Sequence, residues 1–426
     1  MILLTIVNSV IPSYQRPEAE TLQERLREPP RFLIVVAGPR QVGKTTLVRS
    51  VLATYPPERY SFIAVDDPED SSLPRTDPSS APTRRKAAAP RDSAWLVDIW
   101  QRARTAAQRS ADGHILVLDE IQKISRWSDI VKGLWDADRA EGLALHVVLL
   151  GSSPLLMLQG MSESLTGRFE PIHLTHWSFR EMVDAFDFDL EDYLYFGGYP
   201  GSAPLIRIEA RWRNYVNTGL IEPSIEKDIP MMTRVDKPAL LRQLFYLGCR
   251  YSGQELSYTK MMGQLQDAGN TVTLAHYLEL LGNAGLIRGL QKYAGQHHRR
   301  RSSSPKLMVL NMALMSAGSG YTKAEAQADR SYRGRVVESV VGAHLHNTAA
   351  PDCRLYYWRD GTDEVDFVLE RGQRLVAIEV KSGAVPAQLR GFAAFERAFG
   401  ACRHLLIGNG GIPLAEFLSY PAEHWF

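Results

Sequence analysis

The stretch GPRQVGKTT at positions 38–46 directly follows the short apolar run FLIVVA at 32–37. A run that is apolar at every position is typical of a strand buried on both faces of a parallel sheet. Glycines behind the strand let the backbone turn with its N–H groups pointing inward, and the Lys-Thr pair then opens a helix. The spacing G-x-x-x-x-G-K-T in this setting therefore predicts a loop that wraps phosphate groups.

The chemistry of phosphate binding gives this loop its expected contacts. Lys44 is expected to reach the β- and γ-phosphates of ATP, and the hydroxyl of Thr45 is expected to hold Mg²⁺. The helix that begins near Lys44 adds the positive end of its dipole. We expect ATP contacts from nine consecutive residues: Gly38, Pro39, Arg40, Gln41, Val42, Gly43, Lys44, Thr45 and Thr46.

Two acidic residues end the apolar strand HILVLDE at 114–120. Asp119 is expected to anchor Mg²⁺ through water, and Glu120 to polarise the water that attacks the γ-phosphate. Because a pair of acids stands here, the pattern favours hydrolysis of ATP over transfer to a small acceptor. The sequence thus predicts an ATPase site with ATP and Mg²⁺ as its cofactors.

Two residues further along the chain are candidates for contact with the γ-phosphate. Ser152 follows the strand HVVLLG, where a hydroxyl can sense the γ-phosphate or orient water, and the alternative is an ordinary turn serine. Arg168, in LTGRF, can act as an arginine finger, in cis or toward a neighbouring subunit. The alternative for Arg168 is a structural ion pair.

Strands alternate with helices in the first part of the chain, which indicates a parallel α/β sheet. Further along, three helices at 240–248, 257–265 and 271–287 are expected before a two-stranded ribbon, the layout of a winged helix. The basic run HHRRR at 297–301 lies at the tip of that ribbon and would contact phosphates. Since the third helix carries few Arg or Lys, sequence-specific reading of nucleic acid is poorly supported, and a role in protein contacts stays open.

Carboxylates at nuclease-type spacing occur near the end of the chain. Asp366, Glu379 and Lys381 form the pattern D-x₁₂-E-x-K, and strand alternation places Glu379 and Lys381 on one face. Two carboxylates gather Mg²⁺, a nearby lysine can orient water, and Glu338 on the preceding helix can add a third carboxylate. The pattern predicts a PD-(D/E)xK nuclease-like site. A solvated strand face and a nuclease fold without cleavage are the alternatives.

Eight sequence segments together resemble one class of ATPase. They are GPRQVGKTT, LDEIQK, LLGSS, LTGRFEPIHLTHWSFREM, FGGYPG, IEKDI, EVDFVLERG and AIEVKSG. They are similar to the archaeal-ATPase-like AAA-type ATP-binding proteins, P-loop NTPases with a C-terminal domain of unknown function. The resemblance covers nearly the whole chain and implies a RecA/AAA-like core, a winged helix and a restriction-endonuclease-like tail. It also implies that Gln122 belongs to the acidic motif and that Arg168 is the arginine after the sensor strand.

The net charge of +1 provides no bulk attraction to nucleic acid, so any such affinity is expected to be local. No run of about 18 apolar residues occurs, so no membrane-spanning helix is expected. Three scattered cysteines without metal-ligand spacing suggest a reducing compartment, and we expect a cytoplasmic protein. The start MILLTIVNSVI lacks the features of a signal peptide, and is expected to be a leading strand or a tail. The Pro-rich stretch 66–93 has no assigned role.

The fold class expected from these patterns is α/β, with a P-loop parallel-sheet core, a winged-helix region and an α/β restriction-endonuclease-like domain. The expected divisions are an N-terminal segment (1–30), the ATPase domain (31–185), a helical linker (186–235), the winged helix (236–315) and the nuclease-like domain (316–426). The expected function is that of a Mg²⁺-dependent ATPase acting as a multidomain switch. The alternative is a nucleic-acid-binding protein or an ATP-gated DNA nuclease of a defence or mobile-element system. Nucleic acid, a protein partner or a second copy are the expected partners, and a membrane is not.

Overall fold

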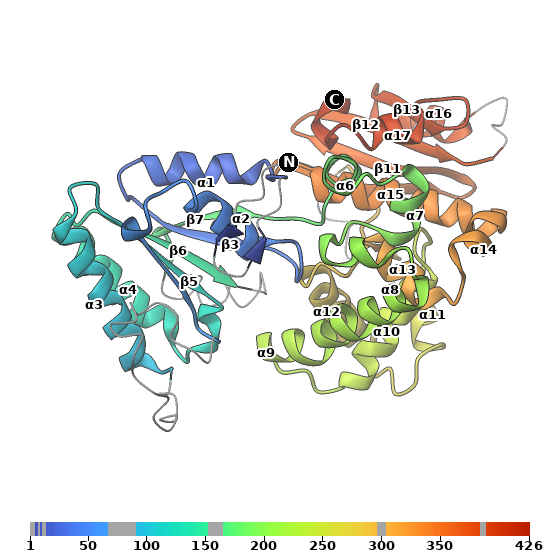
Figure 1. The fold of residues 1–426 in the computed structure, drawn as a ribbon. Helices are drawn as coiled ribbons and strands as arrows, with labels where there is room; N and C mark the ends of the chain where they lie inside the picture. Colours follow the sequence, from blue (N-terminus) through green and yellow to red (C-terminus); the bar gives the residue numbers. More distant parts are fainter. Residues whose placement is uncertain are drawn as a thin grey trace. The chain divides into compact units, whose positions relative to one another are not determined.

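A computed structural model describes residues 14–66, 91–151, 165–295, 304–383 and 389–426, with the backbone of 5–6 and 9–10 (Figure 1). The chain divides into two compact units, Met1–Leu174 and Thr175–Phe426. Each unit is built around a sheet of its own. Among the described residues, no helix is both long and apolar enough to cross a membrane.

The first unit contains a five-stranded sheet, parallel throughout, in the order β4-β5-β6-β3-β7. Its strands are β3 (Leu33–Ala37), β4 (Tyr60–Ala64), β5 (His114–Asp119), β6 (Leu145–Gly151) and β7 (Phe169–His173). Its helices are α1 (Glu18–Arg27), α2 (Lys44–Leu52), α3 (Ser93–Arg109) and α4 (Trp127–Ala140). A short antiparallel pair, β1 (Thr5–Ile6) and β2 (Ser9–Val10), precedes them. The prediction of a parallel α/β sheet is confirmed.

Helices cover both faces of this sheet, which is why its central strands are apolar at every position. Alternate residues of β3 take part in two different cores. Val35 packs in the core with residues of α3 and α4, and Val36 packs in the core with residues of α1 and α2. The apolar run FLIVVA therefore forms a strand that is packed between two layers of helices, and the phosphate-binding loop begins where this strand ends.

Helices dominate the first half of the second unit. The first four are α6 (Phe179–Phe186), α7 (Leu190–Phe196), α8 (Glu209–Tyr215) and α9 (Ile229–Met232). Three more helices follow: α10 (Pro238–Arg250), α11 (Tyr258–Met262) and α12 (Thr271–Asn283). They precede an antiparallel ribbon of β8 (Ile287–Leu290) and β9 (Lys306–Val309). The third helix ends at Asn283, earlier than the predicted 287. Gly285, at a φ of 76°, lets the backbone leave the helix and start β8.

The second half of this unit contains a four-stranded sheet in the order β10-β11-β12-β13. Its strands are β10 (Cys353–Asp360), β11 (Asp363–Arg371), β12 (Arg374–Lys381) and β13 (Arg403–Gly408). Its helices are α13 (Met312–Ser319), α14 (Lys323–Ala328), α15 (Arg330–Thr348), α16 (Arg390–Phe399) and α17 (Leu414–Phe417). The predicted hairpin is present as β11 and β12, which turn at Gly372 with a φ of 61°. The last strand, β13, runs parallel to β12.

Candidate functional site

The loop at 38–46, called the phosphate loop below, joins β3 to the first residue of α2, Lys44. Gly43 has a φ of 90°, a backbone conformation that residues with side chains rarely adopt. A Cβ atom on Gly38 would lie 2.3 Å from the carbonyl oxygen of Leu174, so this position also requires glycine. The glycine spacing of the motif therefore has a direct steric cause.

The side chains of Lys44 and Thr45 make hydrogen bonds beside the phosphate loop. The ammonium of Lys44 donates hydrogen bonds to the carbonyl oxygens of Gly38 at 2.9 Å and Pro39 at 2.8 Å. The hydroxyl of Thr45 donates to the Oδ2 atom of Asp119 at 2.9 Å. Burial raises the pKa of the Asp119 carboxyl above its ordinary value, although the Thr45 hydrogen bond opposes the shift. A hydroxyl and a carboxylate in contact are hard oxygen donors of the kind that Mg²⁺ prefers, so these residues fit the ion.

Glu120 follows Asp119 in a strained backbone conformation, with a φ of 58°. The side-chain amide of Gln122 donates a hydrogen bond of 2.7 Å to the Oε2 atom of Glu120. Lys123 lies 3.9 Å from the same carboxylate and forms an ion pair of 2.7 Å with Asp66. The resemblance implies that Gln122 belongs to the acidic motif, and this hydrogen bond brings its side chain into contact with the Glu120 carboxylate.

Arg168 and the phosphate loop lie at opposite ends of the parallel strands. It immediately precedes β7, whose first residue pairs with Leu33 at the start of β3, and its carbonyl accepts a hydrogen bond of 2.8 Å from the Leu33 N–H. The loop follows the other end of β3, about five residues or roughly 16 Å away at the usual rise of a strand. The guanidinium pairs with Asp136 through Nε–Oδ1 and Nη2–Oδ2 contacts of 2.7 and 3.1 Å. In this arrangement the Arg168 guanidinium does not reach the phosphate loop of its own chain, and the arginine finger, in cis or toward a neighbouring subunit, stays a prediction.

Three sequence features lie wholly or largely outside the described residues. They are Ser152, the basic run 297–301 and most of the Pro-rich stretch 66–93. The residue before Ser152, Gly151, pairs with Ala37, the last residue of β3. The chain therefore leaves β6 next to the phosphate loop, and the role predicted for Ser152 stays a prediction.

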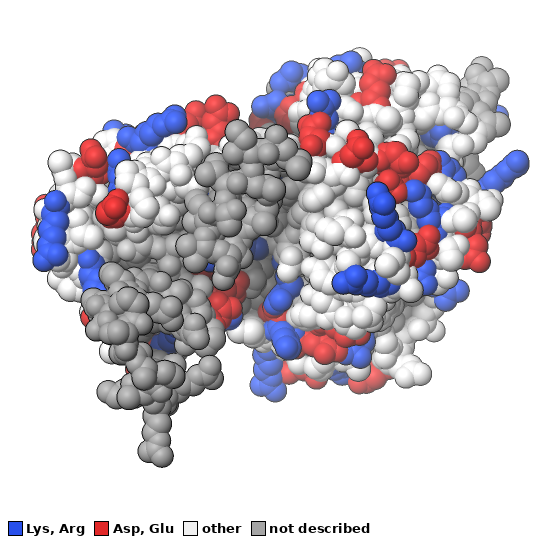
Figure 2. All heavy atoms as spheres, viewed as in Figure 1, with Lys and Arg blue, Asp and Glu red and all other residues white. Residues whose placement is uncertain are grey.

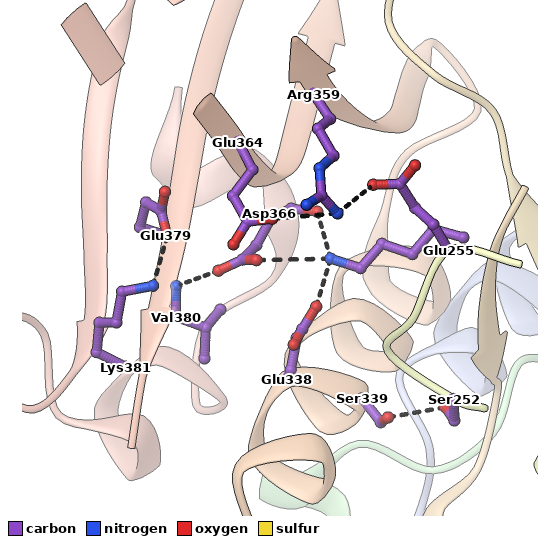
Figure 3. Close-up of polar contacts among 11 residues, drawn as sticks. Ser252, Glu255, Glu338, Ser339, Arg359, Glu364, Asp366, Glu379, Val380 and Lys381 are labelled. Atoms are coloured by element: carbon purple, nitrogen blue, oxygen red, sulfur yellow. Dashed lines mark hydrogen bonds and ion pairs between the residues drawn. The ribbon is translucent and has the colours of Figure 1, made fainter. Parts of the chain in front are cut away.

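The carboxylates predicted near the C-terminus lie close together (Figure 3). Asp366 comes from β11, Glu379 from β12 and Glu338 from α15. These three form what we call the carboxylate cluster. The Oδ2 atom of Asp366 accepts a hydrogen bond of 2.9 Å from the Val380 N–H, and the Lys381 ammonium donates one of 2.9 Å to Glu379. Burial, followed by the nearby Asp366 carboxylate, raises the pKa of Glu379 to about 8.

A second lysine, which sequence reasoning missed, reaches the cluster from β9. The Lys306 ammonium forms an ion pair with Glu338, donates to the Asp366 carbonyl at 3.1 Å and lies 3.6 Å from the Oδ1 atom of Asp366. Burial raises the pKa of Glu338 to about 7, although Lys306 opposes the shift. Burial lowers the pKa of Lys306, but the carboxylates of Glu338 and Asp366 outweigh burial and leave that pKa raised. The only signal in the sequence is a charged residue at the start of the apolar run KLMVL.

The space between Glu338 and Asp366 does not fit a divalent metal in this arrangement. A cation bound there would need oxygen atoms of both carboxylates. Both oxygens of the Asp366 carboxylate already have partners, and Glu338 is paired with Lys306. We therefore derive no metal-assisted step at this cluster.

Family models match three parts of the chain. They describe an AAA domain at 30–183, a domain of unknown function (DUF8612) at 187–325 and a domain of unknown function (DUF4143) at 333–416. An uncharacterized protein of Mycobacterium tuberculosis is 26% identical over 417 residues, which are 97% of this chain and 81% of the relative. An uncharacterized protein of Haemophilus influenzae is 21% identical over 295 residues, which are 66% of this chain and 69% of the relative.

Solved structures provide more distant similarities. The Walker-type ATPase PABY2304 of Pyrococcus abyssi is 15% identical, covers 72% of this chain and 95% of its own, and has a TM-score of 0.45. AMPPCP-bound DnaA from Aquifex aeolicus is 16% identical, with coverages of 62% and 87% and a TM-score of 0.30. The match to the AAA family model spans the parallel sheet and the phosphate loop of the first unit, and supports ATP binding there. The first unit is therefore a domain of the AAA-type P-loop class, while residues 333–416 are similar to a domain whose function is unknown.

Proposed function

We propose that the chain binds ATP together with Mg²⁺ at the phosphate loop and hydrolyses the nucleotide. The observation that carries this proposal is the 2.9 Å contact between the Thr45 hydroxyl and the Asp119 carboxylate, next in sequence to Lys44. Thr45 and Asp119 would hold Mg²⁺, which supplies positive charge to the β- and γ-phosphates when it is bound. Lys44 exchanges its loop carbonyls for phosphate oxygens.

The proposed role of Glu120 is to polarise the attacking water. The hydrogen bond from Gln122 orients its carboxylate, so Glu120 does not have to be ordered during the reaction. A positioned general base contributes about 10²–10⁴-fold to a rate. This assignment makes Glu120 a residue of catalysis and leaves nucleotide affinity to the phosphate loop.

Two substitutions separate binding from turnover. Lys44→Ala should abolish ATP binding, whereas Glu120→Gln should keep binding and slow turnover by about 10²–10⁴-fold. Fluorescent-nucleotide titration measures binding, and phosphate release with Mg²⁺ or with EDTA measures turnover. Asp136→Asn changes a carboxylate of α4 that pairs with Arg168, away from the phosphate loop. This variant is the matched control and should keep the parent rate. Parent-rate hydrolysis by Glu120→Gln would remove that residue from the mechanism.

We propose further that nucleotide state acts on the second unit, as a switch would. The supporting contact is that Gly38 of the phosphate loop packs against Leu174, the last residue of the first unit. A shift of the loop on binding ATP would therefore reach the point where the two units join. Small-angle scattering of Glu120→Gln with and without ATP tests this idea, and identical curves would reject it.

Nucleic acid is the second candidate partner, favoured by the basic run 297–301 between β8 and β9. On the face seen in Figure 2, Lys and Arg mix with Asp and Glu. Helix α12 is where a winged helix would meet base edges, but its Tyr277 is buried and accepts a hydrogen bond of 2.9 Å from the Lys237 N–H, which leaves that ring away from a bound base. ATP turnover with and without DNA or RNA, beside a cleavage gel, tests this candidate. Binding that does not weaken with salt would count against it.

A further inference from the structure

Lys306 is among the most buried charged residues that the structure describes, with 6% of its surface exposed. Its ammonium is surrounded by Glu338 from α15 and by both the carboxylate and the carbonyl oxygen of Asp366 from β11. We propose that Lys306 is the resident cation of the carboxylate cluster and stands where a divalent metal would otherwise bind. Lys306 then joins β9 to α15 and β11, and a divalent metal does not bind between Glu338 and Asp366 while Lys306 is present. This inference does not depend on the ATP site.

The surroundings of the Lys306 ammonium are those of a cation site. Three oxygen atoms of Glu338 and Asp366 approach one nitrogen, and an ammonium has three N–H donors to offer. The nitrogen also lies 4.7 Å from the centre of the Phe367 ring, a cation–π contact. Acidic oxygens with a cation among them match the ligand chemistry of a hard metal ion, but here the cation is covalently attached to the chain.

The backbone around Lys306 is hydrogen-bonded on both sides of its strand. The next residue, Leu307, pairs on its outer side with the chain at Gly253 and Gln254 through hydrogen bonds of 2.8 and 2.9 Å. The hydroxyls of Ser252 and Ser339 lie 2.7 Å apart and connect this segment to α15 beside Glu338 (Figure 3). Strand β9 is therefore held on both sides, because β8 pairs with its other edge. An incoming metal would therefore have to displace the Lys306 ammonium from Glu338 and Asp366.

The rest of the carboxylate cluster is also balanced from within. Glu379 pairs with Lys381 at 2.9 Å, and Asp366 receives the Val380 N–H. Around them, Arg359 lies 3.3 Å from Glu255 and 3.7 Å from Glu364. Removal of the charge of Lys306 alone would thus leave the oxygens of Glu338 and Asp366 facing one another, ready for a divalent ion.

Metal binding to the full chain tests the proposal. Every variant carries Asp119→Asn, which removes the carboxylate proposed to hold Mg²⁺ in the ATP site. Mn²⁺ binding without nucleotide is followed by electron paramagnetic resonance and by the Mn²⁺-induced shift in Tm. Lys306→Met keeps most of the side-chain volume and removes the charge, so it should gain one Mn²⁺ per chain and bind at least about tenfold tighter than its parent. Lys381→Met is the matched lysine control and should gain less, and Asp366→Asn added to Lys306→Met should abolish the gain.

Two results would overturn the proposal. One is a parent that binds Mn²⁺ at the cluster with Lys306 in place, recognised because Asp366→Asn removes the binding. The other is a folded Lys306→Met variant that gains no Mn²⁺. If Lys306→Met fails to fold, refolding with Mn²⁺ and with EDTA is compared. Recovery with Mn²⁺ that Asp366→Asn abolishes supports the proposal, and failure to recover in both conditions rejects a latent metal site.

Discussion

The phosphate loop and the carboxylate cluster each hold a lysine among oxygen atoms, but the oxygens differ in charge. Lys44 donates to two neutral carbonyls of its own loop, whereas Lys306 contacts carboxyl groups of Glu338 and Asp366. A neutral carbonyl is readily replaced by a phosphate oxygen, while a buried ammonium among carboxylates is held by ion pairing. The first arrangement is ready for an incoming anion. The second has balanced its charges within the chain.

Loss of charge at the two lysines should therefore have opposite consequences. Lys306→Met leaves buried carboxylates without their cation and should lower the free energy of unfolding by about 3–5 kcal/mol. Lys44→Met removes hydrogen bonds to carbonyls and should lower it by only about 1 kcal/mol. Urea unfolding monitored by circular dichroism gives both values. ATP binding should respond in reverse, lost in Lys44→Met and retained in Lys306→Met.

Equal destabilisation by the two substitutions would break this comparison. It would mean that Lys44 is a structural cation as much as Lys306 is. Loss of ATP binding in a folded Lys306→Met variant would also contradict the comparison, because it would mean that nucleotide binding depends on Lys306. Lys381→Met is the reference for the loss of stability, since Lys381 pairs with the carboxylate of Glu379 at 2.9 Å.

A smaller effect is expected where the ATP site orients its own carboxylate. Gln122→Ala removes the 2.7 Å hydrogen bond to Glu120 and leaves that carboxylate in place. We expect kcat to fall by about tenfold, the equivalent of one hydrogen bond of about 1.4 kcal/mol, with KM unchanged. Steady-state phosphate release measures both constants. Gln122→Glu is the matched variant of equal size, and a parent kcat in both variants would show that Glu120 needs no orientation.

The strand, turn and helix start around the phosphate loop could be predicted from the sequence because each has a local cause. Gly43 is needed for its positive φ, and the strand before the loop is apolar because helices cover both faces of the sheet. The register of β11 and β12 was also accessible, since the hairpin turns at Gly372 and side chains alternate along each strand. These causes act over a few residues, so one sequence reveals them.

Two features of the structure have non-local causes that the sequence does not reveal. Lys306 meets Asp366, which is 60 residues further along the chain, and a lysine at the start of an apolar strand looks like a solvated residue until its neighbours are known. The position of Arg168 depends on β7, whose sequence FEPIH contains a proline and does not show a strand pattern. An edge strand tolerates proline, because one side of it makes no ladder hydrogen bonds. Once β7 pairs in parallel with β3, the residue before it must lie at the edge away from the loop.

The smallest effect is expected for Arg168→Ala, and it probes what remains of the arginine-finger hypothesis. The guanidinium binds Asp136 and lies a strand length from the phosphate loop of its own chain, so kcat in dilute solution should stay within about twofold of the parent. An arginine offered to a neighbouring subunit would behave differently, because removal of a true finger costs about 10³–10⁵ in rate. Specific activity is therefore measured across a range of protein concentrations. Arg168→Ala and Asp136→Asn should match at every concentration if the ion pair is structural. A rise in parent activity with concentration that only Arg168→Ala abolishes would show that the finger acts between chains.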